Sequence, residues 1–509
     1  MPDLMQDELA VDSASPDPEI RMRLDRLGWI LQMAIHDQDN AWQAAGKWLE
    51  ERWKRGLACS GGYSISERIS NLVLLWNIQA PAQDMAASVR YMIEKDAYQL
   101  LGSLEYHGES KTNNHILNNA RALILAGSFL GDGRFYEAGC WILDNQLRKH
   151  VSADGVVREA STHYQWVVTR WIMETGFVFH SQDTVRLEKL RPLLNSMLDV
   201  CEAMQLGSGH DTYLPLIGDI SPDFPPRLYG GMTRLGFALL GGGEGIESAS
   251  RDSVGLWSHF FKGRDGAAQK NWHADDNSWV RMNHERWHLL AHADMHTDDN
   301  RATHGHHDLF SFELSFGNIP VVIDPGRKDY LAGRDEEEAG ILEEWHNTIL
   351  VDSCRTGFVP RGYMPVPWLK KNRTRPRVMA GEGSLSIRLD GPVEVPGVSC
   401  IKRVLNLADG GRVLVTSQIM KKHVRPTNVR LVLYLAGNAC LTDEGLELRV
   451  GSTSFLLRWQ GMGCPSLRNS CRYISYGVSE PCARLEWDVT TTQAEWFSTI
   501  EIIAQEGVA

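Results

Sequence analysis

Two histidines separated by one residue open the most chemically suggestive segment of the sequence, THGHHDLFSFELSFGNIPVVIDPG. On an extended chain, positions i and i+2 point to the same side, so His304 and His306 would face one point. Asp324 ends the next apolar run, and His346 opens another in HNTILVD. Imidazoles and a carboxylate suit zinc, which takes about three or four nitrogen, oxygen or sulfur ligands. The alternative is a set of strand histidines that bond to backbone groups, because the chain has 18 histidines.

Asn114 and His115 stand directly before the apolar run that begins at Ile116. An amide and an imidazole at a helix start, where backbone N–H groups point outward, would suit a substrate carboxylate. The alternative is helix capping, for which asparagine is among the preferred residues.

A third candidate group surrounds another expected helix start, in GVVREASTHYQW. Arg158, His163 and Tyr164 bring a cation, an imidazole and a phenol to this segment. A tyrosine in such a place commonly packs its ring and leaves its hydroxyl in water. Asp219 and Asp223, in LPLIGDISPD, are weaker candidates, because a Gly-Asp pair is typical of an ordinary turn.

These candidates must be held by two different kinds of structure. Up to about residue 262, apolar residues recur at steps of three and four, which predicts amphipathic helices. Short turn-like links such as GDG at 131–133 predict antiparallel helix pairs. The clearest helical runs are residues 64–77, 116–130, 134–147 and 164–179.

Beyond about residue 275 the apolar period falls toward two. Short runs rich in Val, Ile, Leu and aromatic residues, such as RVLVTSQIM and VRLVLYLA, are bounded by turn residues and predict strands. Many short strands in succession predict an antiparallel sandwich. We therefore expect an acidic disordered tail over 1–20, a helical domain over 21–262, a linker over 263–275 and a β-sandwich over 276–509.

Composition excludes several classes of protein. The 509 residues carry 64 acidic and 52 basic side chains, a formal net charge of −12, with 43% hydrophobic residues. These values are typical of a globular chain and argue against wholesale binding of nucleic acid, which needs clustered Lys and Arg. An anionic partner would therefore have to meet a local basic site. No window is apolar enough over about 18 residues to predict a membrane span.

The first twenty residues and the cysteines both favour a cytoplasmic location. The start of the chain is acidic and lacks the basic and apolar regions of a signal peptide. The 9 cysteines are scattered and contain no CxxC, which favours reduced thiols over a disulfide framework or a thiolate zinc site. A periplasmic or exported location is the alternative, and a homodimer is one assembly that the sequence leaves open.

Four separated motifs together resemble the heparinase II/III superfamily of polysaccharide lyases, a group that includes alginate and oligoalginate lyases. They are NNHILNNARALILAG, EASTHY, HGHHDLFSFELSFGNIPVVIDPG and WHNTILVD, in the order of the family, and the resemblance as a whole covers the chain from roughly residue 60 to 500. The resemblance implies a multidomain chain, in which an incomplete α/α toroid of helix pairs precedes an antiparallel β-sandwich. This expectation agrees with the change in apolar period.

The resemblance also implies roles for single residues. Asn114, with His115 beside it, would bind and neutralise a uronic acid carboxylate, and Tyr164 would be the catalytic tyrosine. His304 would face the substrate as a catalytic histidine. The zinc ligands implied by the resemblance are His306, Asp324 and His346, and the zinc would be chiefly structural. Apart from the resemblance, the charge of Arg158 could help to neutralise the carboxylate, and we expect Arg158 and His163 to bind substrate.

The expected activity is β-elimination of an acidic polysaccharide or oligosaccharide at a 4-linked uronic acid, leaving an unsaturated 4,5-uronate end. Such an enzyme must neutralise the carboxylate, take the C5 proton and protonate the departing oxygen. One alternative is a glycoside hydrolase on a toroid, which needs two carboxylates about 5–9.5 Å apart, and no convincing pair is evident. Another is a non-catalytic glycan-binding or polysaccharide-assembly protein on the same fold.

Overall fold

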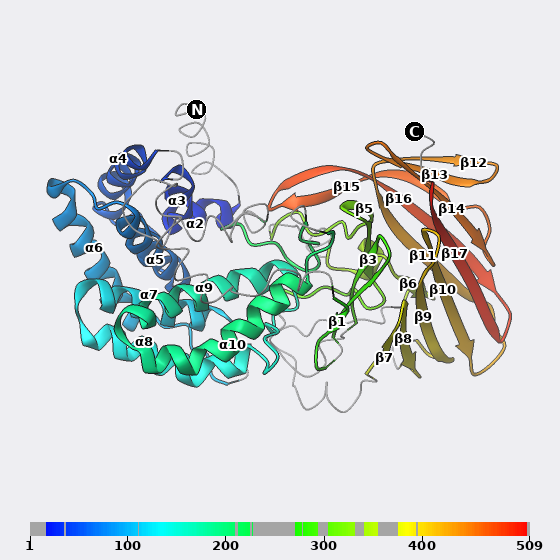
Figure 1. The fold of residues 1–509 in the computed structure, drawn as a ribbon, viewed down its shortest axis with the longest axis horizontal. Coiled ribbons are helices and arrows are strands. Elements are labelled where there is room, and N and C mark those ends of the chain that lie inside the picture. The colour runs from blue at the N-terminus through cyan, green and yellow to red at the C-terminus, as the bar shows by residue number, and fades with distance from the viewer. Residues whose placement is uncertain are drawn as a thin grey trace. The chain divides into compact units, whose positions relative to one another are not determined.

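The structure is a computed structural model of the whole chain. The residues that it describes are 17–34, 37–109, 111–208, 212–223, 226, 270–276, 278–293, 304–330, 340–354, 375–392 and 395–505. They form two compact units, one built of helices and one largely of strands (Figure 1). The expected order, helices first and an antiparallel sandwich second, is confirmed.

The two units do not divide the chain at a single point. Among the described residues, the strand-rich unit also takes Glu159–Tyr164 and Asp199–Ile220, while Gln165–Leu198 belongs to the helical unit. The boundary that the sequence predicts near residue 262 therefore misses two segments of the second unit. The predicted tail over 1–20 also overlaps the first described helix, which begins at Pro18. Residues 263–269 of the predicted linker lie outside the described residues.

Nine α-helices are present in the described part of the chain, and one of them runs on into a short π-helix. They are α2 (Pro18–Arg26), α3 (Gly28–Ala34), α4 (Gln38–Trp48) with its continuation η1 (Leu49–Trp53), α5 (Gly62–Ile78), α6 (Gln83–Leu101), α7 (His115–Leu130), α8 (Gly133–His150), α9 (Thr162–Gln182) and α10 (Thr184–Ala203).

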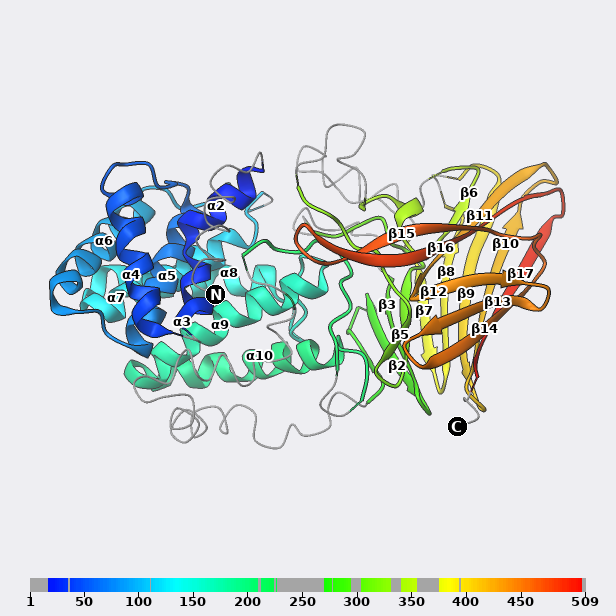
Figure 2. The same ribbon diagram turned by 90° about the horizontal axis from the view of Figure 1, so that it is seen from above.

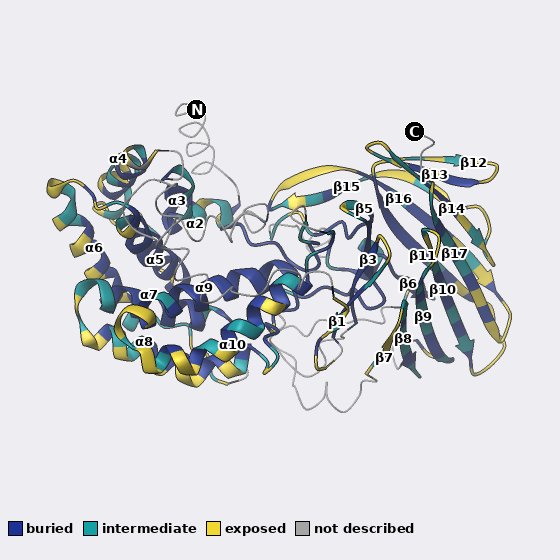
Figure 3. Cartoon of the chain, in the orientation of Figure 1, coloured by how far each residue is buried: buried dark blue, intermediate teal, exposed yellow. Residues whose placement is uncertain are grey.

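The helical unit packs α5 to α8 against one another (Figures 1 and 2). The pattern of α8 shows why it lies on the outside: its buried residues Phe135, Gly139, Ile142, Leu143 and Leu147 fall on one face. Figure 3 shows exposed residues between them along the same helix. At the contact with α7, a Cβ on Gly139 would lie 2.7 Å from the backbone oxygen of Ala120, so only glycine permits this approach.

A buried ion network lies inside the helical unit. The guanidinium of Arg121, which is fully buried, donates to Glu67 of α5 and to Glu174 of α9. Burial alone would raise the pKa of Glu67, but the charges of Arg121 and Arg170 hold it below its usual value. Three helices are therefore joined by charges that cannot reach water.

The strand-rich unit consists of two antiparallel sheets. The order of the first is β1 (Trp272–His273), β2 (Trp279–His284), β3 (Trp287–His292), β4 (Phe312–Phe316), β5 (Ile319–Val322), β11 (Thr427–Ala436), β16 (Val478–Thr491) and β15 (Ser466–Ser475), with β6 (Ile349–Val351) paired to β11. The order of the second is β12 (Asn438–Thr442), β13 (Gly445–Val450), β14 (Thr453–Gln460), β17 (Glu495–Gln505), β10 (Arg412–Lys421), β9 (Val398–Ala408), β8 (Ser384–Asp390) and β7 (Arg377–Gly381).

One hydrophobic core joins the two sheets. It includes Leu289 and Phe312 from the first sheet and Leu385, Leu405 and Ile500 from the second. Residues alternate between buried and partly exposed along β8 and β10, as a strand with one face on a core requires. By contrast, β3 and β4 are buried along their whole length. Within the described residues, no helix is both long enough and apolar enough to span a membrane.

Replacing Arg121 by methionine tests the buried ion network. Arg121→Met should lower the free energy of unfolding by about 3–5 kcal/mol, because Glu67 and Glu174 would stay buried after losing one of the cations that face them. The measurement is denaturant unfolding followed by circular dichroism. Arg134→Met is the control, since the Arg134 side chain is 68% exposed in its pair with Asp132 and its loss should change little. Equal effects of the two substitutions would contradict this account.

Candidate active site

A single buried carboxylate, that of Asp219, lies at the centre of the candidate site in the strand-rich unit. Its Oδ2 lies 3.1 Å from Nδ1 of His304, and its Oδ1 lies 2.9 Å from Nε2 of His306. Nη1 of Arg327 donates to both oxygens, at 3.1 and 3.3 Å. The structure therefore brings one anion against two imidazoles and a guanidinium.

The charges around Asp219 keep it ionised. Burial alone would raise its pKa, but the hydrogen bonds from His304 and His306 and the charge of Arg327 hold that pKa far below the usual range. A carboxylate can only accept hydrogen bonds, so each of its three neighbours must act as a donor.

Tyr164 lies flat against the ring of His304. The two ring centroids are 3.6 Å apart, with an angle of 9° between the planes. The Tyr164 hydroxyl lies 3.2 Å from that of Tyr330, which donates in turn to the backbone oxygen of Ile220 at 3.1 Å. Because that carbonyl takes the proton of Tyr330, Tyr164 is the donor between the two hydroxyls. Two of the predicted catalytic residues, Tyr164 and His304, are thus brought together.

The segment that carries Asp219 is tied to both of these rings. The backbone N–H of Asp219 donates to the oxygen of His304, and its own oxygen accepts from the hydroxyl of Ser161, three residues before Tyr164. Gly218 has a φ of 83°, and a Cβ there would lie 2.7 Å from the oxygen of Ala160. Glycine before Asp219 is therefore what lets this turn lie against the start of α9.

The three predicted zinc ligands are buried close to the same carboxylate. The rings of His306 and His346 are 5.2 Å apart, and Nδ1 of His346 lies 2.8 Å from Oδ2 of Asp324. Burial alone would lower the pKa of His346, but Asp324 raises it to about 9. Nδ1 of His306 and Nε2 of His346 are buried and have no hydrogen-bond partner within the described residues. A pair of unpartnered nitrogens beside a carboxylate fits the donor set of zinc.

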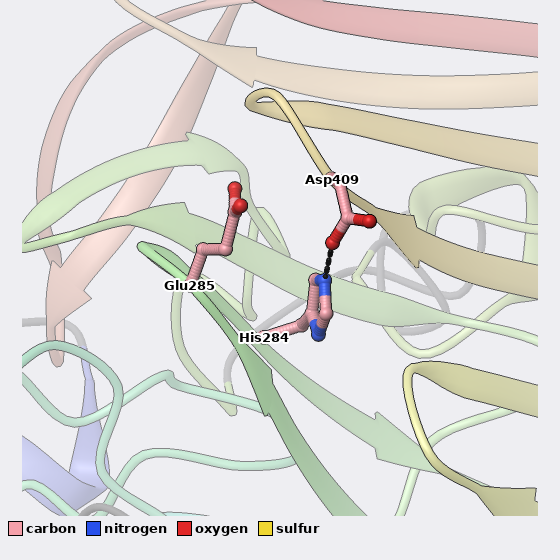
Figure 4. Close-up of side chains that lie close together, drawn as sticks. All are labelled: His284, Glu285 and Asp409. Carbon is pink, nitrogen blue, oxygen red and sulfur yellow. Dashed lines mark hydrogen bonds and ion pairs between the residues drawn. The ribbon is translucent and has the colours of Figure 1, made fainter.

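A different trio of metal-ligating side chains lies at the surface. His284 at the end of β2, Glu285 in the β2–β3 turn and Asp409 in the β9–β10 turn have ligand atoms within 4.8 Å of one another (Figure 4). Nε2 of His284 lies 2.8 Å from Oδ1 of Asp409, whose side chain is 89% exposed. These residues form a surface group, and none of their described contacts reaches the buried carboxylate Asp219.

The helical unit carries the predicted carboxylate-binding residues. Asn114 is buried at the start of α7, where its side chain does not cap the helix, and the side chain of Asn113 bonds to the N–H of His115 instead. His115 is partly exposed, with Nδ1 3.0 Å from Oε1 of Glu105. Capping, the alternative for this motif, is thus carried out by Asn113.

Arg158 and His163 differ in exposure. Arg158 is exposed in the helical unit, whereas His163 is only 1% exposed in the first turn of α9. Of the two predicted substrate-binding residues, Arg158 alone offers its side chain to solvent.

Sequence reasoning missed Arg327 and Tyr330, and it favoured an ordinary turn at Asp219. The burial of Asp219 at 4% exposure shows that this turn is part of the site. The Gly-Asp pair is the one local signal at this position, and the same pair is found in exposed turns, so it does not indicate a buried site residue. Asp223 instead pairs with Arg26 in the helical unit.

Comparison with known proteins identifies the fold. A crystal structure of heparinase III matches with a TM-score of 0.69 over 97% of this chain and 79% of that chain, at 12% identity. The heparan sulfate lyase HepC from Pedobacter heparinus matches with a TM-score of 0.59 over 97% of this chain and 78% of that chain, at 15% identity. A mutant of the same lyase gives a TM-score of 0.61, with the same shares of the two chains and 13% identity.

The chain therefore has the fold of these polysaccharide lyases. Residues 267–447 match the family model of the heparinase II/III-like C-terminal domain, so the strand-rich unit carries that domain. The resemblance to the heparinase II/III superfamily is confirmed. A comparison of the sequence with curated proteins finds no match.

Removal of the Tyr330 hydroxyl tests the pair of tyrosines. Tyr330→Phe should lower the free energy of unfolding by about 1–2 kcal/mol, because the oxygen of Ile220 and the hydroxyl of Tyr164 each lose a partner. Thermal and denaturant unfolding measure the loss. Tyr106→Phe, at a ring that is 49% exposed, is the matched control and should change little. A Tyr330→Phe protein as stable as the wild type would refute the bonding described.

Proposed function

We propose that this protein is a lyase that cleaves a uronic-acid-containing polysaccharide or oligosaccharide by β-elimination. The observation that carries the proposal is the stacked pair of Tyr164 and His304, with Asp219 behind the imidazole. A phenol and an imidazole side by side provide the proton donor and the proton acceptor that an elimination requires. The fold shared with heparinase III adds support.

The elimination moves two protons and consumes no water. His304 takes the proton on C5 of the uronate, the electron pair of that bond forms the C4–C5 double bond, and the bond from C4 to the glycosidic oxygen breaks. Tyr164 gives its proton to the departing oxygen, a transfer for which a positioned phenol hydroxyl is suited. For the opposite epimer at C5, Tyr164 serves as both base and acid: its phenolate takes the C5 proton and the phenol so formed gives that proton to the departing oxygen.

Arg327 belongs to the same strand-rich unit as Tyr164 and His304. Its positive charge suits the carboxylate of the substrate. Its Nη1 bonds to Asp219, and its Nη2 has no hydrogen-bond partner among the residues that the structure describes. A guanidinium offers paired donors to a carboxylate, and this pairing lowers the cost of removing the neighbouring proton. The carboxylate-binding roles of Asn114 and His115, and the assisting roles of Arg158 and His163, remain predictions from the sequence.

His306, Asp324 and His346 are the residues that would hold a zinc ion. Nδ1 of His306 and Nε2 of His346 are the nitrogens available for it, and binding would require Nε2 of His346 to be deprotonated while Nδ1 keeps its contact with Asp324. The ion would supply structural cross-linking of the segments that flank His304. In that arrangement, Nδ1 of His306 would bind the zinc, and Nε2 of His306 would donate to Asp219. Metal-bound histidines commonly donate their second ring N–H to a carboxylate in this way.

The activity is tested with a panel of acidic glycans. Alginate, heparan sulfate, hyaluronan and bacterial exopolysaccharides, as polymers and as oligosaccharides, are incubated with the protein while the absorbance of unsaturated uronate is followed. At least one should give a steady rise, and Tyr164→Phe should lower that rate by about a hundredfold or more, because the proton donor is lost.

Two controls make this assay decisive. The Tyr164→Phe protein must show the wild-type circular dichroism spectrum and unfolding temperature, so that a lost rate reflects chemistry. Tyr91→Phe, at an exposed ring of α6, should retain the full rate. New reducing ends without any rise in absorbance would indicate a hydrolase and overturn the proposal.

Metal analysis tests the zinc residues. The purified protein should contain about one zinc per chain, and His346→Ala should lose the zinc and unfold at a lower temperature. His284→Ala is the matched control, because it removes a histidine from the surface group and should retain the zinc. Loss of zinc in His284→Ala with retention in His346→Ala would assign the metal to the surface group instead.

A further inference from the structure

We infer that Asp219 is a positioning residue of the elimination site, one that fixes the proton and the orientation of the His304 imidazole. The inference rests on the proposed function and adds to it a residue that does not itself react. It starts from the two contacts that restrain the imidazole in the structure.

The first contact sets the plane of the ring. Tyr164 stacks on His304 at a centroid distance of 3.6 Å and 9°, so the imidazole cannot tilt without losing this contact. Stacking alone does not choose between the two flipped orientations of the ring, because a half-turn about the Cβ–Cγ bond keeps the ring plane and exchanges Nδ1 with Cδ2 and Nε2 with Cε1.

The second contact removes this freedom. Oδ2 of Asp219 lies 3.1 Å from Nδ1 of His304, and the backbone N–H of Asp219 also donates to the His304 oxygen at 2.9 Å. A carboxylate accepts only, so Nδ1 must carry a proton in this arrangement. In the neutral imidazole, the lone pair is then on Nε2, which has no hydrogen-bond partner within the described residues. The nitrogen that can accept a proton, Nε2, is therefore the one that does not face Asp219.

Asp219 is itself held in place by more than the histidine. Arg327 donates to both carboxylate oxygens, His306 lies against Oδ1, and Ser161 bonds to the backbone oxygen of Asp219. A buried carboxylate with this many donors has little freedom to rotate. This rigidity is what a group that positions a base requires.

The substitution Asp219→Asn tests the inference with little change in volume. Because an amide can present its NH2 group to Nδ1, the histidine would no longer be held in the reactive tautomer. We expect kcat to fall by about 10²- to 10⁴-fold with KM changed by less than about threefold, the range seen when the partner of a working histidine is removed. Asp219→Glu should recover part of the rate.

A double-variant comparison separates positioning from a general structural effect. If Asp219 acts through the imidazole, Asp219→Asn combined with His304→Gln should lose no more rate than His304→Gln alone. Additive losses would overturn the inference, as would a wild-type kcat in Asp219→Asn. Zinc content is measured on the same samples, and a loss of zinc in Asp219→Asn would attribute the lost rate to His306 instead.

Asp352→Asn is the matched control for this substitution. Asp352 lies in the same unit, accepts from Arg425 at 2.7 Å and from the N–H of Asn428, and has a φ of 53° that asparagine tolerates. It should keep the wild-type kcat.

A magnetic-resonance measurement distinguishes failure of the inference from failure of the proposed function. In protein labelled with nitrogen-15 at histidine, the wild type should show a hydrogen-bonded Nδ1–H signal that disappears in His304→Gln. The same signal should be lost or shifted in Asp219→Asn, whether or not any glycan is cleaved. A signal unchanged in Asp219→Asn refutes the positioning role, whereas a wild type without activity on every glycan refutes the proposed lyase alone.

Discussion

The arrangement of the candidate site depends on one buried negative charge. Moving a carboxylate out of water is costly, and Asp219 is tolerated in the interior because His304, His306 and Arg327 all donate to it. Each of these groups is in turn fixed by the carboxylate. The histidine proposed as the base, a predicted zinc ligand and the cation proposed for the substrate are therefore coupled through two oxygen atoms.

The strand-rich unit supplies the rigid support for this charge. Both sheets contribute to one core, and β3 and β4 are buried along their whole length beside the segment that carries His304 and His306. Two short segments outside the strands complete the unit, and they bring Tyr164 and Asp219. The site thus joins the sheet to loop segments outside it. Gly218 and the hydroxyl of Ser161 allow the segment of Asp219 to lie close to the start of α9.

Much of the fold could be predicted from the sequence because the apolar period is a local property. The runs at 116–130 and 429–436 coincide with α7 and β11 within two residues. The pairing of His304 with Tyr164 was expected only through the resemblance to a family, since the two residues are far apart in the chain. The Gly-Asp pattern predicts an ordinary turn at Asp219, because this pattern is the same whether the aspartate is exposed or buried, and no local signal indicates Arg327 or Tyr330.

The shared fold and the chemistry of the site support different parts of the account. At 12–15% identity, the match to heparinase III and HepC identifies the architecture and leaves the substrate to be established. The proton donor and acceptor come from the geometry of Tyr164, His304 and Asp219. Hydrolysis adds water across the cleaved bond and elimination does not. Whether oxygen from water enters the products therefore decides between the two reactions.

Mass spectrometry of the products formed in water enriched in heavy oxygen tests the central claim most directly. Elimination adds no water, so we predict that the unsaturated fragment has the mass of a dehydrated uronate end and that the bond cleavage introduces no heavy oxygen into either fragment, once exchange at reducing ends is corrected with a product standard. Fragments that gain one heavy oxygen for each bond cut would show hydrolysis and contradict the account.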